Sequence, residues 1–127
     1  MGSLEPPRWE LYEADSGREA LRILRSRVVH VLVSEVELPD TTAFDVAYAL
    51  RRSDRQVPFI LLSDRLSKEL LLRALIARAF TVIRKPVDEG LFRSTLEHLV
   101  GRWYGAEKRR VTGESDLWPG RGDELLL

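Results

Sequence analysis

Three short apolar runs, each ending in polar residues, alternate along the chain with segments whose apolar positions recur at helical spacing. The runs cover residues 31–35, 59–63 and 82–86. Apolar runs of this length, separated by helix-period segments, predict buried parallel strands joined by crossover helices. Functional side chains in such sheets lie just beyond the carboxyl ends of the strands, so these ends are where a site is expected.

The predicted strand ends carry three different chemical groups. Glu35 supplies a carboxylate, Ser63 a hydroxyl and Lys85 an ammonium, each from a different strand. This convergence is the strongest functional signal in the sequence. A serine at a strand end also commonly satisfies the backbone of the following turn, and that structural role is the alternative for Ser63.

Strands and helices are expected to alternate over residues 9–104. The strands are expected at residues 10–14, 28–34, 58–63 and 80–83, and the helices at residues 16–27, 42–52, 67–79 and 88–104. Asp15 or Ser16, and Thr42, are suitable N-caps for the first two helices. Two prolines exclude a regular helix from the leader at residues 1–8, and glycines and mixed charges indicate a flexible tail at residues 105–127.

The order of these motifs resembles the receiver domain of two-component response regulators, over residues 9–103. An acid, Leu-Pro and Phe fall within residues 35–44, Pro-Phe-Ile-Leu-Leu-Ser follows at residues 58–63, and Lys-Pro comes last. The resemblance implies a three-layer, flavodoxin-like (CheY-like) α/β fold, with helices on both faces of a parallel sheet. It also implies cytoplasmic signalling in a two-component phosphorelay.

The resemblance assigns a role to each strand end. Glu35 stands in the position of the phosphate-accepting aspartate, Ser63 in that of the family's Ser/Thr, and Lys85 and Pro86 in that of its lysine–proline pair. Val82 stands where the family often has an aromatic residue that changes rotamer on activation, so aromatic switching is expected to be lost.

The sequence departs from the family at its start. Residues 9–21 resemble the second strand and second helix of a receiver, and the eight residues ahead of them are too few for a first strand and helix, which need roughly 20 residues. The expectation is therefore an N-terminally truncated sheet of four or five strands. The missing strand would be internal, and unpaired backbone groups in a core cost about 1–3 kcal/mol each.

Four repairs of that gap are open. The strand at residues 10–14 could move inward and pair with residues 31–34, or residues 124–127 of the tail could insert as a surrogate strand. A second copy could donate an element, which would give a homodimer. Finally, the chain could be a fragment whose true start lies upstream. In that case it is a truncated copy of a phosphate-accepting response regulator.

The glutamate at position 35 and the absent acids of the first strand change the expected chemistry. Magnesium usually requires one or two carboxylates in near-octahedral oxygen ligation, so Mg²⁺ binding is doubtful and no cofactor or metal site is expected. Glu35 is expected to be an inactive phosphoacceptor equivalent, with no catalytic residue and no enzymatic activity. An ion pair between Glu35 and Lys85 could hold the site in one fixed, phosphorylated-like state. Alternatively, the pocket is a relic and the pair contributes little.

An interaction function is expected instead. The leucine-rich helix at residues 67–79 carries more apolar residues than one buried stripe needs, and the missing first helix uncovers one face of the sheet. In receivers the last two helices and strands form the partner-binding face. The expected interaction face, for a protein partner or for self-association, is Leu70, Leu72, Ile76, Val82 and Phe92.

Composition narrows the remaining classes. The chain has 127 residues, 44% apolar and 31% charged, which indicates one ordinary globular domain. Its formal net charge of zero gives no electrostatic argument for binding nucleic acid or an anionic membrane. It has no cysteine, no apolar stretch of membrane-spanning length and no signal-peptide pattern, and a cytoplasmic location is expected.

Overall fold

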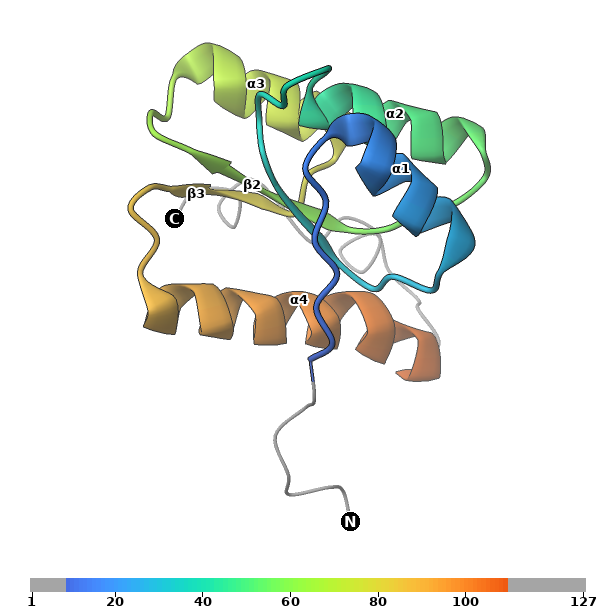
Figure 1. Ribbon diagram of the computed structural model, residues 1–127. Helices are drawn as coiled ribbons and strands as arrows, with labels where there is room; N and C mark the ends of the chain where they lie inside the picture. The colour runs from blue at the N-terminus through green and yellow to red at the C-terminus, as the bar shows by residue number, and fades with distance from the viewer. Residues whose placement is uncertain (1–8, 110–127) are drawn as a thin grey trace.

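A three-stranded parallel sheet lies between two layers of helices in the computed structural model (Figure 1), which describes the backbone of residues 9–109 and the side chains of residues 9–105. The elements in chain order are α1 (Gly17–Ser26), β1 (Leu32–Glu35), α2 (Ala43–Arg52), β2 (Phe59–Ser63), α3 (Lys68–Ala77), β3 (Thr81–Arg84) and α4 (Glu89–Arg109). The strand order is β1-β2-β3, so β2 is central. Helices α1, α2 and α3 cover one face of the sheet and α4 covers the other (Figure 1).

Hydroxyl side chains begin the three helices of the first layer. Ser16, Thr42 and Ser67 each have extended backbone at the N-cap, and each side-chain oxygen accepts a hydrogen bond from the backbone N–H three residues later. These caps satisfy N–H groups that have no partner inside the helix. The cap predicted at Thr42 is confirmed, and of the two candidates Asp15 and Ser16 the structure has Ser16 as the cap of α1.

The core lies on both faces of the central strand, because successive strand residues point to opposite sides. Leu61 of β2 and Val82 of β3 are both fully buried and pack with Ala74 of α3 on the first face. Ile60 of β2 packs with Leu99 of α4 on the second face. The predicted α/β fold with helices on both faces of a parallel sheet is therefore confirmed.

Residues 10–14 form no strand, so this prediction was wrong, and the described residues contain three strands where four or five were expected. The segment rises past the sheet to the start of α1 (Figure 1), and its apolar side chains are exposed. Leu11 is 78% exposed and Trp9 is 47% exposed. A strand is stabilised by the surface that one of its faces packs against, whereas residues 9–15 are all exposed and Tyr12 contacts the guanidinium group of Arg27, 5.1 Å from the ring centroid. Direct pairing of residues 10–14 with residues 31–34 is likewise wrong.

Two other boundaries differ from the sequence prediction. The strand expected at residues 28–34 begins only at Leu32, because Val28 (75% exposed) lies in the connection from α1 to the sheet. Helix α4 runs to Arg109, five residues beyond its predicted end at residue 104. The rest of the predicted tail, residues 110–127, lies outside the described residues, as does the predicted leader.

Candidate functional site

The three predicted polar residues meet at the carboxyl end of the sheet. Glu35 ends β1, Ser63 ends β2 and Lys85 directly follows β3. The Nζ atom of Lys85 lies 3.1 Å from Oε2 of Glu35 and 3.9 Å from Oδ1 of Asp64. The sequence predicts a pair between Glu35 and Lys85 across the ends of neighbouring strands; the contact is present, but the two strands are not neighbours. Since β2 lies between β1 and β3, the pair spans the end of the central strand.

The ion pair is partly open to water. The Lys85 side chain is 32% exposed, that of Glu35 is 58% exposed and that of Asp64 is 83% exposed. Pairs at this exposure typically contribute about 0–1 kcal/mol to stability. The arrangement therefore fixes the position of the lysine head group more than it stabilises the fold.

Ser63 is committed to the turn that follows β2. Its Oγ donates a hydrogen bond to the carbonyl of Arg65 at 2.7 Å and accepts one from the Arg65 N–H at 3.3 Å. The carbonyl of Ser63 in turn accepts from the N–H of Lys85 at 2.8 Å, which ties the ends of β2 and β3 together. The Lys85–Pro86 peptide bond is cis and Pro86 is exposed at the rim of the site.

The donors at this edge do not suit a magnesium ion. Within residues 9–105, no group of three or more acidic, histidine or cysteine side chains is placed to hold a metal. The two carboxylates nearest the site, Glu35 and Asp64, face the ammonium of Lys85, which opposes a divalent cation at the same place. At the predicted phosphoacceptor position, the Glu35 carboxylate is thus paired with Lys85. Few other oxygen atoms of the described residues are available there as metal ligands.

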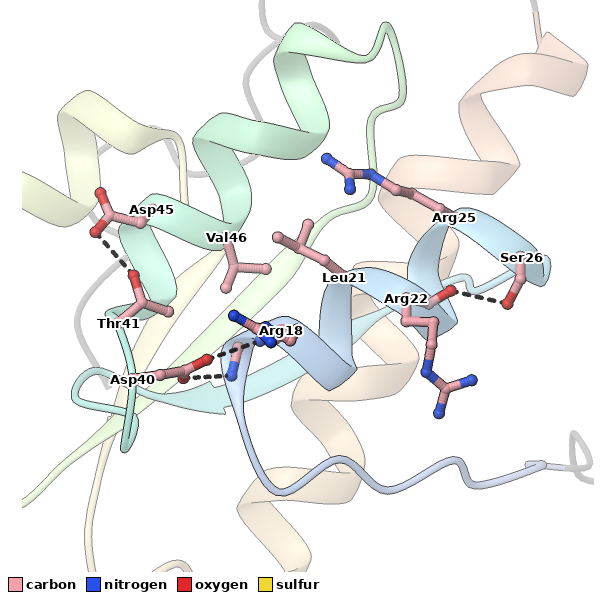
Figure 2. A pocket seen from close by; sticks show the side chains of 10 residues that line it. Arg18, Leu21, Arg22, Arg25, Ser26, Asp40, Thr41, Asp45 and Val46 are labelled. Carbon is pink, nitrogen blue, oxygen red and sulfur yellow. Dashed lines mark hydrogen bonds between the residues drawn. The ribbon is translucent and has the colours of Figure 1, made fainter.

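Asp40, which the sequence analysis did not single out, connects the site loop to α1. From the loop between β1 and α2, its Oδ1 accepts from the N–H of Gly17 at 2.8 Å and its Oδ2 from the N–H of Arg18 at 3.1 Å. Figure 2 shows these bonds at one end of a groove between α1 and α2. The hydrogen bond from Gly17, followed by that from Arg18, holds the pKa of the Asp40 carboxyl below its usual value of 3.8.

No local signal could have identified Asp40. Asp40 lies two residues before Thr42, so its position in the sequence suggests a role at the start of α2. Its hydrogen-bond partners, however, are about 22 positions earlier in the chain. Only the packing of α1 beside the loop after β1 places the carboxylate at the α1 N-terminus, where a negative charge is favourable.

The structure separates the residues of the predicted interaction face. Leu72 and Ile76 are 57% and 70% exposed on α3. Val82 is fully buried, so its inclusion was wrong: β3 is covered on both faces, and Val82 packs between the sheet and α3. Leu70 and Phe92 are partly buried, and they pack against the clusters on the first and second face respectively.

Comparison with known proteins gives a consistent family. The model of the response regulator receiver domain matches residues 3–97. The luminescence regulatory protein LuxO of Vibrio campbellii is 26% identical over 85 residues, which is 67% of this chain and 19% of the Vibrio protein. The two-component response regulator ORR3 of Oryza sativa subsp. indica is 29% identical over 87 residues, 66% of each chain. The chain thus spans about a fifth of the length of LuxO.

Solved structures of receiver domains have the same fold as this chain. The signal receiver domain of a LuxO repressor protein from Vibrio parahaemolyticus superposes with a TM-score of 0.74, covering 82% of this chain and 80% of that one, at 15% identity. This likeness concerns the fold alone. The chemotaxis protein CheY4 of Vibrio cholerae reaches a TM-score of 0.66 at 26% identity, covering 70% of this chain and 76% of that one.

Proposed function

The chain belongs to the response regulator receiver domain family, and on this basis we propose that it is a two-component signalling domain whose output does not depend on phosphorylation. Receiver domains are in general signalling domains and not enzymes, and the proposal includes no catalytic residue. The output is delivered by contact with a protein partner or with a second copy of the chain. A cytoplasmic location is part of the same proposal. Among the described residues, no helix is long and apolar enough to cross a membrane.

The observation that carries the proposal is the 3.1 Å contact between Lys85 and Glu35. Receivers place a lysine where it contacts the phosphoryl group on the acceptor. Here the same ammonium is already matched by a carboxylate of the protein. The proposed consequence is that the strand ends are held in one state without a transferred phosphate. The remaining pocket hydroxyl, Ser63, is committed to its own turn.

The lack of suitable metal ligands supports the same conclusion. Receiver domains typically bind Mg²⁺ at the phosphorylation site, where the ion neutralises charge that develops during transfer. Glu35 and Asp64 both face Lys85, and the described residues contain no larger acidic cluster. A phosphoryl donor at this edge would therefore meet little charge compensation beyond the lysine itself.

The proposed contact surface is an exposed apolar patch on α3, made by Leu72, Leu75 and Ile76. Residues three and four apart share one helix face, so these three side chains form a continuous strip. Leu75 is 41% exposed and is part of this patch, whereas Leu70, which the sequence analysis included in the interaction face, packs against the core. Contiguous exposed apolar surface of this kind commonly marks an interaction site.

Acyl-phosphate labelling tests the phosphorylation part of the proposal. Wild-type protein with acetyl phosphate and Mg²⁺ should incorporate no phosphate, while a receiver with an aspartate acceptor is labelled in parallel as a positive control. Glu35→Gln serves as the matched blank. Label on wild-type protein that is absent from Glu35→Gln would show that Glu35 accepts phosphate, and the domain would then be a phosphate-accepting regulator.

Light scattering after size-exclusion chromatography tests the contact surface. If the patch mediates self-association, wild-type protein elutes as a dimer and Ile76→Glu as a monomer. Glu97→Lys, which reverses a charge at an exposed position of α4 away from the patch, is the control and should stay dimeric. A wild-type monomer would exclude self-association and leave a foreign protein as the partner.

A further inference from the structure

The groove between α1 and α2 is separate from the strand-end site. It has a volume of about 660 Å³ and opens to solvent. Leu21 of α1 and Val46 of α2 form its apolar floor, and Arg18, Arg25 and Ser26 lie along the α1 side. In Figure 2 the side chains of Arg18 and Arg25 flank this floor, whereas Arg22 points away from α2.

Two of these arginines form no side-chain ion pair within residues 9–105, although Arg18 lies near enough to Asp40 for its charge to help lower the pKa of that carboxyl. Arg22 pairs with Glu19 at 3.7 Å on the same helix. For Arg18 and Arg25, no carboxylate among residues 9–105 lies within 4.0 Å of the guanidinium group. Asp40 directs its carboxylate to backbone N–H groups at the α1 start, and Asp45 accepts from Thr41 at 2.9 Å. Asp40 and Asp45 line the α2 end of the groove, whereas Arg25 has no carboxylate of the described residues near it. An apolar floor with guanidinium groups along its α1 side suits a segment that carries both acidic and large apolar side chains.

The end of the same chain has this composition. Residues 114–127 contain Glu114, Asp116, Asp123 and Glu124 against a single arginine, so the segment has a formal charge of −3. Its apolar residues are Leu117, Trp118, Leu125, Leu126 and Leu127. A tryptophan beside acids is a favourable anchor for an apolar floor rimmed by arginines.

Helix α4 lies on the opposite face of the sheet from the groove, but near its end it contacts the connection that follows α1. Tyr104 of α4 donates a hydrogen bond from its hydroxyl to the carbonyl of His30 at 2.5 Å, and the two rings lie 5.3 Å apart. His30 is in the connection that follows α1, four residues after Ser26 at the end of the groove. Residues 110–127 can span about 60 Å when extended, well beyond the dimensions of a domain of this size.

We propose that the groove between α1 and α2 binds the acidic, apolar segment 114–127 of the same chain. Its acids pair with Arg18 and Arg25, and its apolar side chains cover Leu21 and Val46. Because the segment is tethered, its local concentration at the groove is high, and weak individual contacts suffice.

Disulfide trapping in the full chain tests this directly, because the protein contains no cysteine of its own. Ser26→Cys/Ser115→Cys places one thiol at the groove and one in the segment. Ser94→Cys/Ser115→Cys, with the first thiol on the exposed side of α4, is the matched control. Under dilute oxidising conditions, thiol titration and mass spectrometry should show the groove pair closing about tenfold faster than the control pair.

Charge variants identify the contacts. Adding Arg18→Gln/Arg25→Gln should slow the groove disulfide about fivefold, which corresponds to the loss of two exposed ion pairs. Arg22→Gln should have little effect. Circular dichroism of each variant confirms that it is folded. Equal closure at Ser26 and Ser94, or a rate unchanged by Arg18→Gln/Arg25→Gln, would overturn the proposal. Cross-linked dimers in place of an internal disulfide would overturn it as well, and would show that a second copy occupies the groove.

Discussion

Lys85 and Glu35 face each other across the end of the central strand, with 3.1 Å between Nζ and Oε2, although their own strands are not neighbours. The contact requires all three strands to be in register, because β1 pairs with β2 from Leu32↔Phe59 and β2 with β3 from Ile60↔Thr81. A slip of one residue would turn the side chains to the opposite face. The pair therefore reports on the integrity of the sheet as well as on the site.

Glu35→Gln should lower the free energy of unfolding by less than about 1 kcal/mol at low salt, because the pair is half open to water. Urea unfolding at low salt and at 1 M NaCl measures this, and the difference should shrink at high salt. Asp64→Asn is the control, with a smaller effect expected from its longer 3.9 Å contact. A loss of several kcal/mol in Glu35→Gln would mean that the pair is far more shielded than described.

Asp40→Asn should destabilise the protein in a pH-dependent way. The hydrogen bonds from Gly17 and Arg18 lower the pKa of Asp40 in the folded state below 3.8, so the unfolded state binds the proton more readily. The stabilisation is therefore fully present above that pH and is lost as the pH falls through the lower, folded-state pKa. Urea unfolding between pH 2 and pH 7 should show wild type and Asp40→Asn converging in acid. A difference that stays constant over the whole range would contradict this.

Gly17→Ala should be destabilising by about 1–3 kcal/mol, as expected for overpacking. A Cβ atom at position 17 would lie 2.2 Å from Cγ2 of Thr41, whose hydroxyl is held by Asp45 at 2.9 Å. Thermal unfolding measures the loss, and Thr41→Ser, which removes that methyl group, should restore part of it in the double variant.

Gly101→Ala provides the opposite control. Gly101 lies inside α4, and a Cβ atom there would meet nothing within 4 Å. Since alanine is favoured over glycine inside helices, this variant should be more stable by about 0.5–1 kcal/mol. Equal effects at positions 17 and 101 would show that space around Gly17 is not the cause.

Leu61→Ala and Leu72→Ala should differ sharply although the chemical change is the same. Leu61 is fully buried in the central strand, and its truncation should cost about 2–5 kcal/mol. Leu72 is 57% exposed on α3, and its truncation should change stability by less than about 0.5 kcal/mol. Denaturant titration of the two variants measures the change in the free energy of unfolding for each substitution. A large loss in Leu72→Ala would mean that α3 is covered in solution.

Arg78→Gly should stabilise the protein by about 0.5–1 kcal/mol. Arg78 ends α3 in the left-handed region, with φ of 67°, where a Cβ atom is unfavourable and glycine is not strained. Thermal unfolding measures the gain. Arg93→Gly is a suitable comparison, because it places glycine at an exposed position inside α4 and should lower stability.

The sequence alone determined the order of strands and helices from the first helix onward, the cap at Thr42, and the meeting of Glu35 and Lys85 at one sheet edge. These features depend on local periodicity, on short-range hydrogen bonding and on the rule that parallel strands end together. These features can be predicted because each depends either on residues a few positions apart or on the repeated strand–helix–strand connection of a parallel sheet.

Only the tertiary structure decided which faces of the strands and helices are covered. In it, residues 10–14 lie outside the sheet, Val82 is buried and Leu75 is exposed. Asp40 lies at the start of α1. Each outcome depends on partners distant in the chain: the alternation of a strand does not say whether another element lies beside it. Apolar spacing likewise cannot distinguish a buried stripe on α3 from an exposed one, because that difference is made by what packs against the helix.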